Sequence, residues 1–224
     1  MIRTKLKDRV LPEYTHKEEM INMISHIVGG GMGIVVTALC VVIGVLHHNA
    51  YSVVGGAIFG ATMILLYTMS AIYHGLNPDK MSKKIFQVFD HCAIFLLIAG
   101  TYTPLTLCPI RSYNPALGWS IFGIVWGMAV LGIVFNSIDL KKYRKFSMVC
   151  YLGMGWCIII TIGDLVKMFS VPALVFLVLG GLSYTIGSVL YVVGKKKKYM
   201  HSLFHFFVVL GSLLHSLLIM LYVL

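Results

Sequence analysis

Apolar residues fill the chain in seven long blocks, which short polar segments separate. Each block is about 20 residues or longer, the length that an α-helix needs to cross the hydrocarbon core of a bilayer. The predicted spans run at about Ile21–Leu46, Ser52–Leu76, Ile85–Cys108, Ala116–Phe135, Ser147–Phe169, Val171–Val193 and Met200–Leu224. Little more than Ser170 and Pro172 separates the fifth span from the sixth, but a single helix across both would be far longer than the bilayer is thick. The pattern therefore predicts an all-α membrane protein, a seven-transmembrane helix bundle.

Basic residues fall unevenly on the two sides that successive polar segments would face. One side holds 16 of the 18 lysines and arginines, and the other holds only Arg111 and Lys167. The sixteen are Arg3, Lys5, Lys7, Arg9, Lys17, Lys80, Lys83, Lys84, Lys141, Lys142, Arg144, Lys145 and Lys195–Lys198. Because basic residues accumulate in cytoplasmic connections, we expect a cytoplasmic N-terminus and a C-terminus outside the cell. Residues 1–20 would then form a basic cytoplasmic segment, and residues 21–224 the transmembrane domain of a multi-pass plasma-membrane protein.

Composition supports a membrane protein and argues against two other classes. Hydrophobic residues make up 58% of the chain and charged residues 12%, with a mean hydropathy of +0.88. A soluble domain has about a quarter of its residues charged, so the soluble class is excluded. The formal charge of +10 lies in short connections rather than in a basic domain, so we expect no binding to nucleic acid.

Eight polar residues in or just beside the predicted spans lie at one depth, in the third of the bilayer nearest the cytoplasm. Those on the first span are spaced i, i+3, i+7, and each pair on the second and seventh spans is spaced i, i+4, so each set shares one helix face. A polar side chain inside a bilayer is costly and usually has a specific partner. The residues are Glu19, Asn22, His26, Ser70, His74, Asp90, His201 and His205.

Three of these histidines have the donor set of a hydrolytic zinc site, which is three imidazoles and one open position. Zinc polarises a carbonyl and lowers the pKa of bound water to about 7. We assign His74, His201 and His205 as ligands, and Asp90 as a base toward the water or a partner of a ligand. Ser70, one turn before His74, would orient an imidazole or donate to a developing oxyanion. Any single one of these histidines could instead face headgroups, and Asp90 could instead bridge helices or cap the third span.

The polar residues also form motifs that resemble those of the progestin and adipoQ receptor (PAQR) family. The motifs are Glu19-x2-Asn22-x3-His26, Ser70-x3-His74 followed by Asp90, and His201-x3-His205. The short connections and the stretch from Phe89-Asp90-His91 to Gly100-Thr101-Tyr102-Thr103-Pro104 resemble the hemolysin III branch of that family. The resemblance covers essentially the whole chain.

This resemblance implies a seven-helix bundle with zinc near its cytoplasmic side, held by His74, His201 and His205 beside Ser70 and Asp90. The family is similar to membrane hydrolases that include alkaline ceramidases, which implies hydrolysis of a lipid amide and a membrane lipid as substrate.

Three functions remain open at this point, and we rank them in this order. The first is a zinc-dependent lipid amidase at the cytoplasmic leaflet. The second is a membrane sensor or receptor in which the zinc is structural. The third is a pore or transporter, which the name of the hemolysin branch suggests. Zinc itself is inferred from the ligand type, and imidazole also suits copper, nickel and iron.

Overall fold

The computed structural model describes residues 3–193 and 197–224, so Lys195 and Lys196 of the basic run lie outside the described residues. Within these ranges the chain is helical and contains no strand. Six helical stretches are long and apolar enough to cross a membrane. Their main helices are α1 (His16–Leu46), α2 (Ala50–Gly75), α3 (Met81–Leu105), α5 (Pro115–Trp156), α7 (Val171–Val193) and α8 (Met200–Leu218). The prediction of an all-α membrane bundle is confirmed.

Shorter elements connect or extend these helices. The single turn η1 (Leu6–Asp8) precedes α1, and α3 continues through η2 (Thr106–Ile110) into α4 (Arg111–Tyr113). The remaining elements are η3 (Cys157–Thr161), α6 (Ile162–Met168) and η4 (Ile219–Val223).

The helix α5 contains a sharp break at Asp139, whose backbone is extended with φ −158° and ψ 94°. The Asp139 carboxylate accepts the backbone N–H groups of Lys141 and Lys142, each at 3.1 Å, and so caps the helix that follows the break. The Ser147 hydroxyl donates to Asn136 Oδ1 at 2.6 Å, although these residues would lie about 16 Å apart along a straight helix. The chain therefore turns back on itself at Asp139.

This break changes the expected connection between the fourth and fifth predicted spans. The polar segment between these two spans, residues 136–146, is helical at every residue except Asp139. Pro115–Met168, with 54 residues, is one of the six long apolar helical stretches. The count of seven crossings and the orientation of the termini stay predictions.

The first helix begins about one turn earlier than predicted, at His16 instead of Ile21. Thr15 and Glu18 form a capping box, in which the Thr15 hydroxyl accepts the Glu18 N–H and the Glu18 carboxylate accepts the Thr15 N–H. Glu19 therefore lies inside α1 and shares a helical face with Asn22 and His26, as the spacing predicts.

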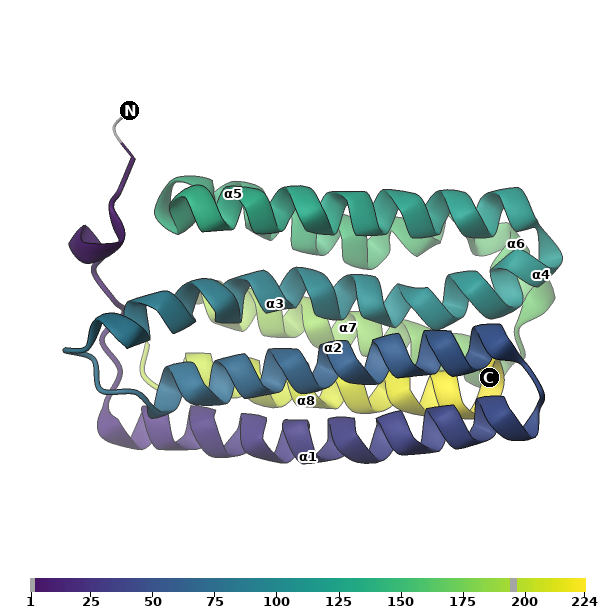
Figure 1. Ribbon diagram of the computed structural model, residues 1–224, viewed down its shortest axis with the longest axis horizontal. Helices are drawn as coiled ribbons and strands as arrows, with labels where there is room; N and C mark the ends of the chain where they lie inside the picture. The colour runs from purple at the N-terminus through teal and green to yellow at the C-terminus, as the bar shows by residue number, and fades with distance from the viewer. Residues whose placement is uncertain (1–2, 194–196) are drawn as a thin grey trace.

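The starts of α1, α3 and α8 meet the end of α2 at one end of the bundle (Figure 1). The opposite end holds the α1–α2 connection, α4 and the C-terminus. Near the second end, α1 and α2 approach so closely that a Cβ on Gly44 would lie 2.6 Å from the Val53 nitrogen. Polar residues that are distant in sequence thus reach one end of the bundle together.

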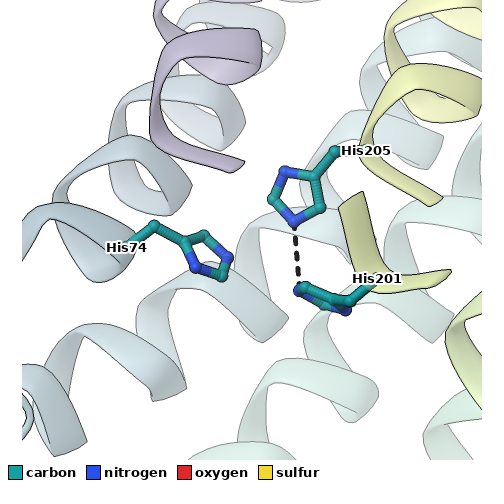
Figure 2. A group of neighbouring side chains, drawn as sticks. All are labelled: His74, His201 and His205. Atoms are coloured by element: carbon teal, nitrogen blue, oxygen red, sulfur yellow. Dashed lines mark hydrogen bonds between the residues drawn. The ribbon is translucent and has the colours of Figure 1, made fainter. Parts of the chain in front are cut away.

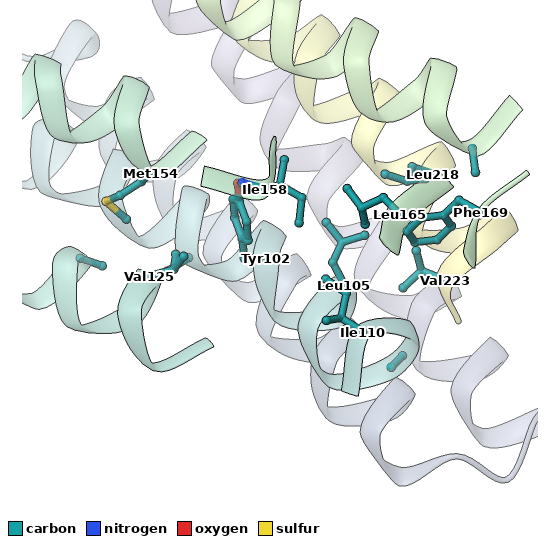
Figure 3. Packing of buried hydrophobic residues seen from close by; sticks show 14 of the residues in the cluster. Tyr102, Leu105, Ile110, Val125, Met154, Ile158, Leu165, Phe169, Leu218 and Val223 are labelled. Atoms are coloured by element: carbon teal, nitrogen blue, oxygen red, sulfur yellow. The ribbon is translucent and has the colours of Figure 1, made fainter. Parts of the chain in front are cut away.

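Buried apolar side chains fill the space between α3, α5, α6, α7 and α8 (Figure 3). We name as the apolar cluster the members of this core that lie toward the end opposite the polar residues. These members are Leu105, Ile110, Leu165, Phe169, Leu218 and Val223. The cluster packs the far ends of α3 and α8, two of the helices that carry polar residues at their other ends.

Candidate metal centre

Three buried histidines converge where the end of α2 meets the start of α8 (Figure 2). His74 lies in the last turn of α2, and His201 and His205 lie one turn apart at the start of α8. One nitrogen from each ring lies within 4.8 Å of the other two. The His201 and His205 Nε2 atoms are 3.1 Å apart. The structure therefore brings together the three residues that the sequence proposes as ligands.

The arrangement fits a tetrahedral metal ion. Two nitrogens bound to one zinc at about 2.0–2.1 Å lie about 3.3 Å apart, close to the spacing of the His201 and His205 nitrogens. His74 Nε2 is buried and has no hydrogen-bond partner. A buried imidazole nitrogen without a partner is costly unless a ligand takes its lone pair. The triad can thus hold a metal ion.

The Nδ1 side of the His74 ring is held by a carboxylate, which in turn binds a buried lysine. Glu19 Oε2 lies 2.5 Å from His74 Nδ1, and Glu19 Oε1 accepts a hydrogen bond from Lys83 Nζ at 2.6 Å. Lys83 is 1% exposed and also donates to the carbonyl of Leu76 at 2.9 Å. Because Glu19 accepts the proton on Nδ1, the Nε2 atom of His74 keeps its lone pair for a ligand. This network joins α1, α2 and α3 behind one ligand.

Asn22 and His26, the other residues of the first motif, also contact the triad. Asn22 Nδ2 lies 3.4 Å from His74 Nδ1. The His26 ring stacks on the His205 ring with centroids 3.8 Å apart, and both of its nitrogens are buried without a partner. The face that the i, i+3, i+7 spacing predicts is the face of α1 that meets the histidines.

The start of α8 has an unusual backbone that aims the two histidines. Tyr199, which precedes the helix, has a left-handed conformation with φ 63°. Its backbone N–H donates to Glu18 Oε1 at 2.7 Å, which ties the start of α8 to the start of α1. His201 and His205 are thereby held against α1 and α2.

Ser70 and Asp90 line the same cavity as the histidines of α8. The cavity has a volume of about 170 Å³, and both residues line it together with His201 and His205. Ser70 Oγ is buried without a hydrogen-bond partner, whereas Asp90 Oδ2 lies 3.5 Å from Nδ1 of its neighbour His91. The structure thus brings both residues to one cavity, and their catalytic roles stay predictions.

Sequence reasoning missed Tyr14, which contacts the triad directly, and Lys83, which contacts it through Glu19. Lys83 belongs to a basic segment that the sequence predicts to be a cytoplasmic connection, and only its place beside the third span hints at its burial. Tyr14 precedes α1, yet its ring stacks on His201 with centroids 4.7 Å apart and an interplanar angle of 18°. Burial raises the pKa of the Tyr14 hydroxyl. No pattern in the sequence marks Tyr14, because it lies outside every predicted span.

Comparison with known proteins finds one family over nearly the whole chain. The family model described as "Haemolysin-III related" matches residues 14–216, a range that includes all three histidines. Hemolysin-3 of Bacillus cereus is 35% identical over 208 residues, which are 93% of this chain and 93% of that protein. The Hemolysin-3 homolog of Bacillus subtilis (strain 168) is 37% identical over 199 residues, covering 89% and 91% of the two chains.

A more distant relative comes from animals. The monocyte to macrophage differentiation factor of Homo sapiens is 24% identical over 177 residues, covering 76% of this chain and 71% of that protein.

Proposed function

The chain belongs to the haemolysin III branch of the PAQR family, and on this premise we propose that it is a zinc-dependent hydrolase of a membrane lipid amide. Three observations support this proposal: two histidines of the triad, an unpartnered serine hydroxyl and an aspartate line one cavity between membrane helices, and His74 lies beside these two histidines. The observation that carries it is this convergence. A purely structural metal site has no need of Ser70 and Asp90 on a cavity wall.

Zinc is the metal that the donor set favours. Three neutral imidazoles with an open position form the usual site of hydrolytic zinc, and no thiolate lies among the three ligands. Zinc, when bound, would polarise a carbonyl and lower the pKa of water. His74, His201 and His205 would hold it.

Asp90 and Ser70 would carry the remaining chemistry. An Asp90 oxygen would accept the proton of the attacking water and return it to the leaving amine. Ser70 Oγ would donate a hydrogen bond to the carbonyl oxygen as negative charge develops there.

The same cavity has space for an acyl chain. Its lining reaches from His201 to His215, which are 14 residues and about 21 Å apart along α8. Apolar and aromatic residues such as Leu97, Ile98 and Trp156 line the part beyond the histidines. A long-chain amide lipid would place its amide at the triad and its chain along this part.

The test uses purified protein in phosphatidylcholine vesicles that contain ceramide as the probe. We expect about one zinc per chain by elemental analysis, and release of fatty acid from the ceramide. Asp90→Asn should keep the zinc and lower turnover by about 10²–10⁴-fold, the usual contribution of a general base. The control Asp79→Asn, at an exposed position before α3, should leave both unchanged. Zinc content without turnover of the amide lipid would overturn the hydrolase.

One observation favours a structural zinc site in a sensor as the second candidate. The His26 ring stacks on His205 with both nitrogens unpartnered, so it offers a fourth imidazole beside the triad. Four protein ligands would make a closed site, and chelation would then lower thermal stability sharply. Retention of zinc by the His26→Ala variant would count against this alternative.

A further inference from the structure

A groove runs along the outer surface where α1 and α2 meet. It has a volume of about 590 Å³, and its lining is almost entirely apolar or glycine, with Thr68 as one of its few polar residues. On α1 the lining extends from Met23 to Ile34, which is about 16 Å of helix. Both helices are apolar enough to cross a membrane, so the groove opens toward lipid.

Two consecutive glycines leave this space open. A Cβ added to Gly31 would have no neighbour within 4 Å, and one added to Gly30 would meet only the Tyr67 Cβ at 3.8 Å. Gly29 differs, because its Cβ would lie 2.7 Å from the Tyr67 ring, so that glycine is needed for close packing. The packing of α1 against α2 therefore does not require glycine at positions 30 and 31.

His26 lines both the groove and the metal cavity. Its side chain packs edge-on against Tyr67, with ring centroids 5.0 Å apart, and on its other side stacks on His205. The residue is 3% exposed, and neither ring nitrogen has a hydrogen-bond partner. One imidazole thus separates a lipid-facing groove from the triad, and it has both a donor and an acceptor to offer.

We propose that this groove binds the acyl chain of an amide lipid from the bilayer, and that His26 hydrogen-bonds the polar amide or hydroxyl groups of that lipid. An apolar groove of this length within membrane-spanning helices is complementary to a hydrocarbon chain. The lipid's polar groups would satisfy the two imidazole nitrogens, whose burial without a partner costs free energy. A helix of a second copy could also lie on the glycines, but its apolar side chains would leave His26 unsatisfied.

The groove would then be a lateral route between the bilayer and the metal cavity. In naming an amide lipid as its ligand, the proposal rests on the proposed function, but binding in the groove needs no metal.

The test uses a ceramide that carries a photoreactive diazirine in its acyl chain, in phosphatidylcholine vesicles with the purified protein. Labelled residues are mapped by mass spectrometry at increasing amounts of probe. We expect labelling of Met23–Ile34 and Ile64–Leu76 to saturate, whereas labelling of the exposed face of α5 rises in proportion to the probe. Saturation separates a binding site from the lipid that surrounds every membrane protein.

Gly31→Leu fills the groove without meeting a protein atom at its Cβ, and should lower the saturable labelling by about tenfold. The matched control is Gly127→Leu, because Gly127 of α5 is also exposed with no atom within 4 Å of its Cβ and lines neither space. Ala71→Phe fills the groove from α2 and serves as the second variant if Gly31→Leu does not fold. His26→Leu should lower ceramide labelling by about tenfold through a lost hydrogen bond, and His26→Gln should restore part of it.

Three outcomes would overturn the proposal. They are labelling of the groove that never saturates (surrounding lipid only), saturable labelling that Gly31→Leu and Ala71→Phe leave unchanged, and a dimer that Gly31→Leu dissociates, which would assign the groove to a second copy.

The His201→Ala/His205→Ala double variant separates this proposal from the proposed function. Saturable labelling in that variant, with no turnover by the wild type, would leave the groove in place and remove the hydrolase. Turnover that is unchanged in Gly31→Leu, with no saturable labelling, would leave the hydrolase in place and remove the groove as a binding site.

Discussion

The two ends of the bundle differ in the side chains that the same helix, α8, contributes to each. The helix α8 begins with His201, Ser202 and His205 at the polar end, and continues past Leu218 into Val223 in the apolar cluster. In the apolar cluster side chains fill the space (Figure 3), whereas at the polar end a cavity remains. The difference indicates that the apolar cluster stabilises the bundle, while the polar end leaves space beside three histidines that could hold a metal ion.

Unpartnered polar atoms show the same contrast. At the polar end Asn22 Oδ1, Ser70 Oγ, His74 Nε2 and both His26 ring nitrogens are buried without a hydrogen bond. Each such atom costs about 1–3 kcal/mol unless a ligand or water satisfies it. The apolar cluster offsets part of this cost through burial of Leu105, Ile110, Leu165, Phe169, Leu218 and Val223.

The largest expected effect is the loss of metal from the polar end alone. The His201→Ala/His205→Ala double variant removes two of three ligands, so metal content should fall from about one ion per chain to almost none. Elemental analysis of purified protein measures this content. The control is His215→Ala on the same helix, where the lost contact is a hydrogen bond to the Leu177 carbonyl. Metal that survives the double variant would remove the triad as the binding site.

The converse change should affect stability and leave the metal in place. Leu165 is 0% exposed in the apolar cluster, and Leu165→Ala should lower the free energy of unfolding by about 2–5 kcal/mol. Denaturation of the detergent-solubilised protein measures this loss. Ile160→Ala is the matched control, because Ile160 is 88% exposed. If Leu165→Ala also lost the metal, the two ends would not be separable.

The sequence could predict the triad because the evidence for it is periodic. The i, i+4 pair His201 and His205 lies on one face of an apolar block, and the charge asymmetry brings His74 to the same depth. The structure confirms that these three rings meet. The helices are equally predictable, because a long apolar segment in a bilayer must pair its backbone N–H and C=O groups internally, and an α-helix does so.

Breaks within helices, and contacts that long side chains make far from their own backbone, are not predictable in this way. The break at Asp139 has no glycine or proline beside it, and depends on a carboxylate that caps two N–H groups. Lys83 is buried because its long side chain reaches Glu19 and the end of α2, which no spacing rule shows. Tyr14 reaches His201 from a segment that carries no pattern.

The network behind His74 should have a smaller effect, confined to the polar end. In Glu19→Gln the amide can still accept from Lys83, but its NH₂ group would then face His74 Nδ1. That contact favours the tautomer with its proton on Nε2, the atom that should bind the metal. Metal affinity should fall by about 10–100-fold, as is usual when the partner of a ligating histidine is lost.

Competition with a chelator of known affinity measures this change. Glu13→Gln is the control, because Glu13 is an exposed acid near the start of α1. An unchanged affinity in Glu19→Gln would mean that the carboxylate does not set the tautomer of His74.

The smallest effect should come from Tyr14, which covers the polar end from outside the predicted spans. Its ring stacks on His201, and aromatic stacking contributes about 0.5–1.5 kcal/mol. Tyr14→Ala should therefore weaken metal binding by about 2–10-fold, whereas Tyr14→Phe keeps the ring and should bind as the wild type does. The same chelator competition measures both variants. A loss in Tyr14→Phe equal to that in Tyr14→Ala would assign the effect to the hydroxyl, and the N-terminal segment would then support the site through polar contact instead of stacking.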